Sequence, residues 1–264
     1  MTNEALLVRV DGRGVATVTI NRPEVRNAFD ENLISLLTDA FDRLASDAAV
    51  RVIVLASVGP TFCAGADIAW MQRTAVATKE DNLADAKRFA DMMLAIAACP
   101  KPVVARIQGA AYGGGVGLAC AADIVVASEV ARFCVSEAKL GILPAVIGPY
   151  LINAVGLRQA KRLALSCCVV DAEESLVVGL ANEIVTETEL DVAIERHVNE
   201  LLRAAPHAQC EIKQLFFSLG IGPITEAVRE LTAQTISRVR ASDEARSGFS
   251  AFQSKREPSW VPQS

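Results

Sequence analysis

One glycine-rich segment constrains the fold of this chain more than any other. The stretch Gln108 to Cys120 contains five glycines and no charged residue, and it follows a strand-like run, Val103 to Ile107. From Leu118 to Ala122 the pattern continues as a helix. Glycines between a strand and a helix allow a tight turn and a close approach by another backbone or a ligand. The first N–H groups of such a helix suit an anion, or an oxygen that becomes an anion during a reaction. Two interpretations stay open: an anion-binding turn, or glycines that only let a buried helix pack against a sheet.

Composition and charge exclude several classes of function. The chain has 264 residues, is 52% hydrophobic and has a net charge of -5, so we expect one continuous unit with a large core and a tendency to oligomerise. An acidic chain is a poor partner for nucleic acid. The uncharged stretch Ile107 to Ala122 is too short and too rich in glycine to cross a membrane. Met1 to Glu4 has no basic region like that of a secretory signal, so we expect a cytoplasmic protein without a membrane partner.

Cysteine and histidine usage argues against two further kinds of site. The seven cysteines are scattered and form no CxxC pair, which is typical of free thiols in a reducing compartment. The only histidines are His197 and His207, with no acid or thiol at ligand spacing, so we expect no metal site. The shortage of histidine also disfavours Ser-His or Cys-His nucleophilic chemistry.

The hydrophobic pattern predicts an α/β fold. Leu6 to Val10 and Val15 to Ile20 alternate like the strands of a hairpin, and Asp30 to Asp47 has helical spacing with Asp30 as N-cap. Further segments follow as strand (Val52 to Ala56), helix (Asp81 to Ala98), strand (Val103 to Ile107), and two short strands (Ile124 to Ala127 and Arg132 to Val135). Helical patterns dominate from Ile147 onward, with a break near Glu183 to Val185. Repeated strand-then-helix units favour α/β with a helical C-terminal region.

A second glycine-containing turn lies upstream, at Phe62 to Ile68. It also follows a strand and precedes a helical segment. Two such turns with free N–H groups are able to aim two donors at one carbonyl oxygen, and such a pair stabilises an enolate.

One acidic residue stands where a strand gives way to a turn bounded by glycine and proline. This residue, Glu137, lies within Phe133 to Pro144. It is either a solvated loop residue or a catalytic acid/base, and with no histidine nearby in the sequence it is the candidate for proton transfer.

Four segments in register carry a resemblance to a known family. These are Asn21 to Ala28, Phe62 to Ile68, Gln108 to Asp123 and Phe133 to Pro144. Together they resemble the enoyl-CoA hydratase/isomerase (crotonase) family. The resemblance implies a crotonase (ClpP-like) spiral of β-β-α units over residues 1–200 and a helical C-terminal region over residues 201–264. It also implies that this region packs on the core and forms a homotrimer or a dimer of trimers.

The resemblance further implies an acyl-CoA substrate, no other cofactor, and a set of site residues. The oxyanion donors would be the backbone N–H groups of Ala66 and Gly114, and Glu137 would be the catalytic acid/base. The remaining substrate-binding and CoA-binding candidates are Arg26, Ala64, Asp67, Ile68, Tyr112, Gly113 and Lys255. In this group Arg26 would lie near the CoA phosphates, and Lys255 would reach the CoA of a neighbouring subunit. Asp67 and Asp123 are expected to cap or orient turns rather than to transfer protons.

One departure from the family pattern bears on the reaction. Two-acid hydratases of the family carry a glutamate two residues after the third glycine, where this chain has Gly117. A single carboxylate suits a Δ3,Δ2-enoyl-CoA isomerase, and it also suits hydratases of branched glutaconyl thioesters. Ala66 to Met71, Asp81 to Ala86 and the tail from Ala251 to Trp260 are similar to 3-methylglutaconyl-CoA and isohexenylglutaconyl-CoA hydratases of leucine and acyclic terpene breakdown. We therefore expect a hydratase of this branch, with isomerisation and a non-catalytic CoA-binding role as alternatives.

Overall fold

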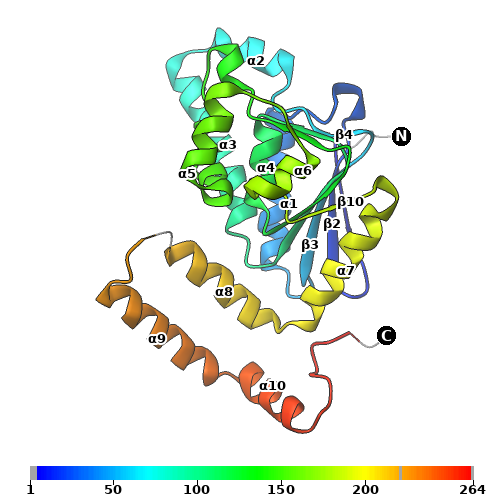
Figure 1. Cartoon of the computed structure of the whole chain (residues 1–264), viewed down its shortest axis with the longest axis vertical. Helices are drawn as coiled ribbons and strands as arrows, with labels where there is room; N and C mark the ends of the chain where they lie inside the picture. The colour runs from blue at the N-terminus through cyan, green and yellow to red at the C-terminus, as the bar shows by residue number, and fades with distance from the viewer. Residues whose placement is uncertain (1–4, 220–221, 263–264) are drawn as a thin grey trace.

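The computed structural model describes residues 5–219 and 222–262, whose strands form two sheets (Figure 1). The larger sheet has the order β1 (Leu6–Val10), β2 (Val15–Ile20), β3 (Val52–Ser57), β5 (Val103–Ile107), β7 (Ile124–Ser128) and β10 (Glu183–Val185). The smaller sheet has the order β4 (Thr61–Cys63), β6 (Ala110–Tyr112), β8 (Arg132–Cys134) and β9 (Val170–Asp171). Neighbouring strands are parallel except in the pairs β1–β2 and β8–β9.

The chain repeats one unit as it moves between the sheets. A long strand of the larger sheet is followed by a short strand of the smaller sheet and then by helix, in the successions β3–β4, β5–β6 and β7–β8. The helices after these pairs are α2 (Ile68–Ala75) with α3 (Lys79–Ala97), α4 (Gly114–Ala121), and α5 (Gly148–Ser166), which the 3-10 turn η2 (Glu137–Leu140) precedes. This succession is the β-β-α spiral that the resemblance implied.

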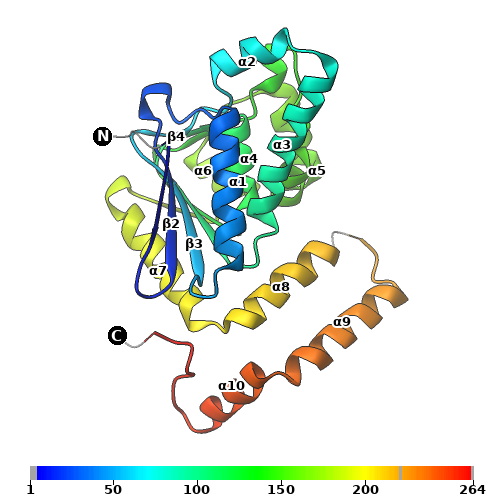
Figure 2. The same cartoon turned by 180° about the vertical axis from the view of Figure 1, so that it is seen from behind.

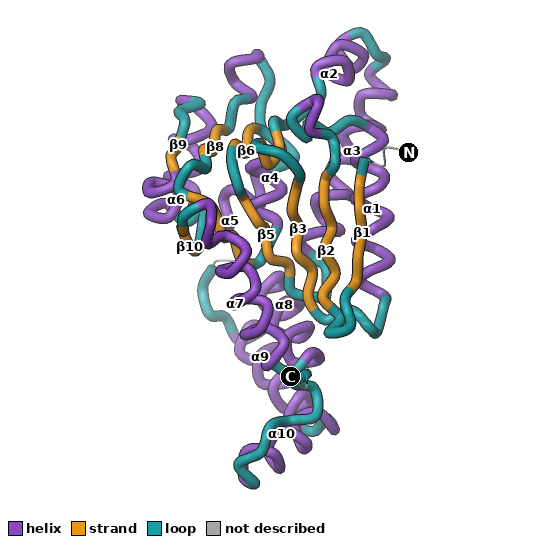
Figure 3. Tube along the Cα trace, turned by 90° about the vertical axis from the view of Figure 1, so that its right-hand side faces the viewer, coloured by secondary structure: helices purple, strands orange, loops and turns teal. Residues whose placement is uncertain are grey.

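Helices cover both faces of the larger sheet, as the rear and side views show (Figures 2 and 3). On one face lies α1 (Glu31–Ser46), which begins where the Asp30 side chain accepts a 2.9 Å hydrogen bond from the Leu33 N–H. The other face is covered by α7 (Leu190–Arg203). Apolar side chains of α7 and of the strands form a separate small core there, including Leu190, Ile194, Val198, Val54, Val104 and Val126. The main core lies on the α1 side, between the sheets and helices α1, α3 and α4.

The C-terminal helices extend from the body as an arm (Figure 1). They are α8 (Pro206–Leu219), α9 (Glu226–Arg240) and α10 (Asp243–Gln253), while α6 (Ala172–Val178) and the 3-10 turns η1 (Pro23–Val25) and η3 (Glu187–Glu189) belong to the body. Large apolar side chains of the arm stand exposed in the single chain, among them Phe216, Phe217, Phe249 and Phe252. The tail returns to the body, where the Trp260 carbonyl accepts a 2.9 Å hydrogen bond from Arg51.

The sequence predicted most of these elements and missed the shortest ones. The hairpin, the Asp30 cap, the central strands and the break at Glu183–Val185 are confirmed. The predicted helix from Asp81 begins earlier, at Lys79, because the Thr78 side chain caps it. Strands β4, β6 and β9 are three residues or shorter, and β6 lies inside the glycine-rich segment, so no periodicity reveals them. Over the described ranges, no helix combines the length and the apolar character that a membrane crossing requires.

Candidate active site

The two glycine turns meet at one edge of the smaller sheet. Because β4 and β6 are parallel neighbours, the turns that follow them lie side by side. Gly65 adopts a φ of +90°, and a Cβ there would lie 2.9 Å from the Tyr112 carbonyl oxygen and 3.6 Å from the Gly114 nitrogen. Only glycine fits this contact, since an L side chain rarely adopts that φ and would collide with the neighbouring backbone.

The turns present two backbone N–H groups that have no acceptor. Phe29 forms a parallel bridge with Ala66, in which the Phe29 N–H donates to the Gly65 carbonyl (2.9 Å) and the Asp67 N–H donates to the Phe29 carbonyl (3.0 Å). These bonds use the residues on either side of Ala66, so the Ala66 N–H is directed away from Phe29. Gly114 is the first residue of α4, where an N–H lacks an intrahelical acceptor. Within residues 5–219 and 222–262 neither N–H donates a hydrogen bond, and both residues line one cavity.

The glycine run serves both functions that the sequence left open. Gly109 and Gly115 allow tight packing, because a Cβ would lie 1.9 Å from the Pro60 carbonyl oxygen at Gly109 and 2.4 Å from the Cys63 carbonyl oxygen at Gly115. Gly113 and Gly114 line the cavity instead. Gly109 and Gly115 therefore hold the turn against the chain around β4, while Gly113 and Gly114 present their backbone to the cavity.

Glu137 lies against the second turn. A Cβ on Gly113 would lie 3.4 Å from the Glu137 Oε1, and Glu137 lines the same cavity. Its other oxygen, Oε2, is buried and has no hydrogen-bond partner among the described residues. Burial raises the pKa of this carboxyl, while the N–H groups of Glu137 and Ser136 oppose the shift. A carboxyl with a raised pKa and an unpartnered oxygen is suited to move a proton.

The cavity has a volume of about 430 Å³ and mostly apolar walls. Phe29 stands at its base, with ring centroids 6.1 Å from Trp70 and 5.1 Å from Phe89. Two polar residues of α3, Asn82 and Asp85, also line it. Neither was expected to be a site residue, although both lie within Asp81 to Ala86, a segment that carries part of the resemblance. The sequence feature that could have pointed to this pair was the Asp85 carboxylate at an inward position of the amphipathic helix.

Gly117 has no room for the side chain that two-acid hydratases carry at this position. A Cβ there would lie 2.3 Å from the Ile147 Cγ2 and 3.3 Å from the Met93 Cε. Ile147 precedes α5 and itself lines the cavity. An apolar side chain therefore takes the space into which a second acid would extend from α4.

The remaining candidates differ in whether they line this cavity. Ala64 lines the cavity, whereas Asp67 and Ile68 do not. Asp67 caps α2 by accepting hydrogen bonds from the Ala69 and Trp70 N–H groups, as expected of a turn residue. Ile68 opens α2 with its side chain 70% exposed.

Arg26, Tyr112 and Lys255 do not line this cavity in the described part of the chain. Arg26 is exposed, and its carbonyl accepts a 3.0 Å hydrogen bond from the Ala64 N–H, so its backbone adjoins the first turn. Tyr112 contributes its carbonyl to the contact with Gly65. Lys255 follows α10, at the opposite end of the molecule from α2 and α3 (Figure 1). Contact between Lys255 and a CoA molecule therefore requires another subunit, and this role stays a prediction.

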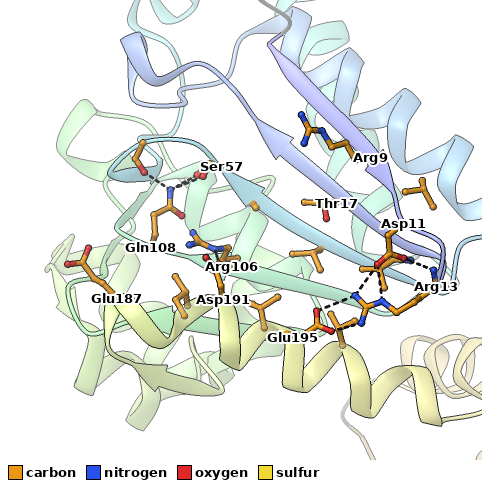
Figure 4. Close-up of a pocket in the computed structure, with 18 residues that line it drawn as sticks. Arg9, Asp11, Arg13, Thr17, Ser57, Arg106, Gln108, Glu187, Asp191 and Glu195 are labelled. Atoms are coloured by element: carbon orange, nitrogen blue, oxygen red, sulfur yellow. Dashed lines mark hydrogen bonds and ion pairs between the residues drawn. The ribbon is translucent and has the colours of Figure 1, made fainter. Parts of the chain in front are cut away.

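A larger cavity of about 790 Å³ lies between the larger sheet and α7 (Figure 4). Two of its three arginines already have carboxylate partners: Arg13 pairs with Asp11 and Glu195, and Arg106 pairs with Asp191 at 2.6 Å. Neither Ala66 nor Gly114, whose N–H groups lack an acceptor in the described ranges, lines this larger cavity. In the described ranges, no three His, Cys, Asp or Glu side chains are placed to hold a metal ion. The candidate active site is therefore the smaller cavity.

Comparison with known proteins places the chain in a family. The sequence model for Enoyl-CoA hydratase/isomerase matches residues 11–263, so the chain belongs to the enoyl-CoA hydratase/isomerase family. An enoyl-CoA hydratase structure from Shewanella pealeana is similar, with 37% identity, a TM-score of 0.94 and coverage of 98% of this chain and 97% of that one. Pseudomonas aeruginosa AtuE is similar at 33% identity and a TM-score of 0.93, over 98% of this chain and 100% of that one. The trans-2-decenoyl-[acyl-carrier-protein] isomerase of Streptococcus mutans is 28% identical over 99% of each chain.

Proposed function

We propose that this enzyme reversibly hydrates a branched enoyl-CoA of the 3-methylglutaconyl-CoA or isohexenylglutaconyl-CoA type. Activity of the enoyl-CoA hydratase/isomerase type follows from the family. The observation that carries the proposal is one cavity holding two free N–H donors, Ala66 and Gly114, together with the buried, unpartnered Glu137 oxygen. The acyl-CoA thioester is the substrate, and the reaction requires no other cofactor.

In the proposed mechanism the turns and Glu137 act on neighbouring atoms of the thioester. The carbonyl oxygen accepts hydrogen bonds from the Ala66 and Gly114 N–H groups, which stabilise the enolate and so acidify the α-carbon. Glu137 transfers the proton at the α-carbon as water adds to the β-carbon or leaves it. Burial raises its pKa, which makes the ionised carboxylate a stronger base toward the α-carbon.

Two features support a branched substrate. The space beside Gly117 is taken by Ile147, so α4 supplies no second acid for water. A substituted β-carbon tolerates positive character during hydration and depends less on such an acid. The aromatic and aliphatic walls formed by Trp70, Phe89 and Leu143 fit a branched acyl group.

Isomerisation is the second candidate, and one observation favours it. A Δ3,Δ2-enoyl-CoA isomerase moves a proton between two carbons with a single base, and the wall at Ile147 offers water no polar partner. The isomerase from Streptococcus mutans is also a full-length relative.

A substrate panel tests the proposal. The enzyme is assayed with crotonyl-, 3-methylglutaconyl- and isohexenylglutaconyl-CoA in water enriched in ¹⁸O, and the product is analysed by mass spectrometry. We expect ¹⁸O in the product and a higher kcat/KM for a branched substrate than for crotonyl-CoA. A shifted double bond without ¹⁸O would identify an isomerase. No turnover of any enoyl-CoA would support a non-catalytic CoA-binding role.

We also propose that the chain forms a homotrimer or a dimer of trimers. The resemblance and the exposed Phe216, Phe217, Phe249 and Phe252 of the arm support this assembly. Light scattering coupled to size-exclusion chromatography gives its mass.

A further inference from the structure

Asp85 is an unusual residue for its position. Of the charged residues that the structure describes, it alone is buried, with 9% of its surface exposed. Together with Met92, Met93 and Ile96, which lie further along the helix, it makes up the buried residues of α3. Charged side chains are rarely buried without a partner or a function.

Asp85 has a partner for only one of its oxygens. Its Oδ1 accepts a 2.7 Å hydrogen bond from Arg88, one turn later on the same helix. The Oδ2 accepts no hydrogen bond from the described residues, and the residue lines the cavity that contains Glu137. One oxygen of this cavity-lining residue therefore remains available to accept a further hydrogen bond.

The described lining of the cavity contains two ionisable side chains, Glu137 and Asp85, and they come from different elements, η2 and α3. Glu137 lies beside the oxyanion turn, and Asp85 lies on α3 with the amide of Asn82 one turn before it. Adding water across a double bond requires a group that takes a proton from water and a group that gives a proton to carbon. Glu137 adjoins the N–H groups that would bind the thioester oxygen. Asp85 is therefore available as a separate acceptor for the proton of the water.

The geometry points to Asp85 as the second carboxylate of the active site, which binds the reacting water and accepts its proton. This inference rests on the proposed hydration. The water oxygen bonds to the β-carbon as a water proton passes to Asp85, and the electron pair of the double bond moves to the thioester oxygen. Protonated Glu137 then gives its proton to the α-carbon as the enolate collapses. Each turnover leaves Asp85 protonated and Glu137 ionised, and a proton passing between them through solvent restores the site.

The environments of the two carboxyls match these roles. Asp85 carries a cationic partner, Arg88, and a carboxylate in an ion pair is an acceptor. Glu137 has a buried oxygen with no partner and a pKa raised by burial, which favours its protonated form.

Two measured reactions separate this role from a structural one. Hydration requires both carboxyls, whereas exchange of the α-proton of a saturated branched acyl-CoA in D₂O, followed by NMR, requires only the oxyanion donors and Glu137. We expect Asp85→Asn to lower the kcat of hydration by roughly 10²-fold or more and to leave the exchange rate almost unchanged. Glu137→Gln should lower both rates.

Matched variants control for folding and for the ion pair. Arg88→Gln removes the partner but keeps the carboxylate, so it should retain most of the hydration rate. Asp85→Glu keeps a carboxylate on a longer side chain and should recover part of the activity lost in Asp85→Asn. Circular dichroism and thermal unfolding establish that each variant is folded.

Several results would overturn the inference. If the Asp85→Asn variant hydrates the substrate as fast as the wild type, Asp85 takes no part in the reaction. If the variant loses α-proton exchange as strongly as hydration, Asp85 has a structural role. A raised KM restricted to substrates with a distal carboxylate, at unchanged kcat, would make Asp85 a determinant of acyl recognition instead. A wild-type enzyme that exchanges the α-proton but hydrates no enoyl-CoA refutes the proposed hydration itself, and with it the role of Asp85.

Discussion

The two cavities of this chain differ in how their polar groups are used. In the larger one, between the sheet and α7, Arg13 and Arg106 are already paired with carboxylates of the same cavity (Figure 4). The smaller one is mostly apolar, yet it contains two N–H groups without acceptors and a buried carboxyl oxygen without a donor. Buried polar groups are normally satisfied within the protein, so those that are not mark a place where a ligand supplies the partner. The larger cavity also holds one unpartnered buried oxygen, the Oε1 of Gln108, but among the described residues the smaller cavity is the one that combines two N–H groups without acceptors with an unpartnered carboxyl oxygen.

Removing the Glu137 carboxyl from the smaller cavity should have the largest effect. Glu137→Gln keeps the shape of the side chain but ends proton transfer, so we expect kcat to fall by roughly 10²–10⁴-fold. Glu195→Gln in the larger cavity is the matched control and should leave kcat and KM unchanged. Steady-state kinetics with the best substrate of the panel measures both. A kcat of the Glu137→Gln variant within a few-fold of the wild-type value would exclude Glu137 as the group that transfers the proton.

Disturbing one oxyanion donor should have the next largest effect. In Gly114→Ala the added Cβ would lie 2.1 Å from the Phe29 Cζ, so the turn must move. Loss of one donor of this kind lowers the rate by roughly 10²–10³-fold. Gly148→Ala is the control, because nothing lies within 4 Å of a Cβ there. Equal activity of the two variants would show that the Gly114 N–H does not bind the thioester oxygen.

The space beside Gly117 provides a third test. Its Cβ would lie 2.3 Å from Ile147, so Gly117→Ala should destabilise the protein by about 1–3 kcal/mol, as overpacking does. Ile147→Ala in the same chain should recover part of this loss, and urea unfolding of the two single variants and the double variant measures the coupling. Gly117→Glu should lower hydration of both branched and crotonyl substrates. A gain of crotonyl-CoA hydration would mean that Ile147 moves aside and that the missing acid alone defines the substrate class.

The sequence predicted those parts of the site that depend on neighbours along the chain. A strand, glycines and a helix start are contiguous, so two turns with free N–H groups were predicted, and the resemblance implied Ala66 and Gly114 as the donors. Both residues line one cavity and neither N–H donates a hydrogen bond within the described ranges, while their binding of a thioester oxygen stays a prediction. The position of Glu137 at the end of a strand also depends only on neighbours along the chain, so the sequence could predict it. Ile147 opposite Gly117, and the face of α3 that carries Asp85, depend on contacts between distant segments that no local pattern encodes. The same holds for Lys255, whose predicted role requires another subunit.

The smallest predicted effect is on stability, and it should have opposite signs in the two cavities. Burial raises the folded-state pKa of Glu137 above the ordinary value of 4.5. A group of this kind contributes stability that is complete below the unfolded-state pKa and is lost as pH rises through the folded-state pKa. The stability of Glu137→Gln relative to the wild type should therefore increase as pH rises above the ordinary carboxyl pKa of 4.5. Urea unfolding at several pH values measures this difference.

Glu195 should behave in the opposite way. The hydrogen bond from Arg13 lowers its pKa, although burial opposes the shift. Its stabilising contribution is therefore present above the unfolded-state pKa and is lost as pH falls through the folded-state pKa. Since both side chains of the pair are more than a third exposed, Glu195→Gln should cost only about 0.2–1 kcal/mol near neutral pH and nothing in acid. If both variants changed stability in the same direction with pH, the contrast between a satisfied and an unsatisfied carboxylate would not distinguish the cavities, and the assignment of the active site would rest on the turns alone.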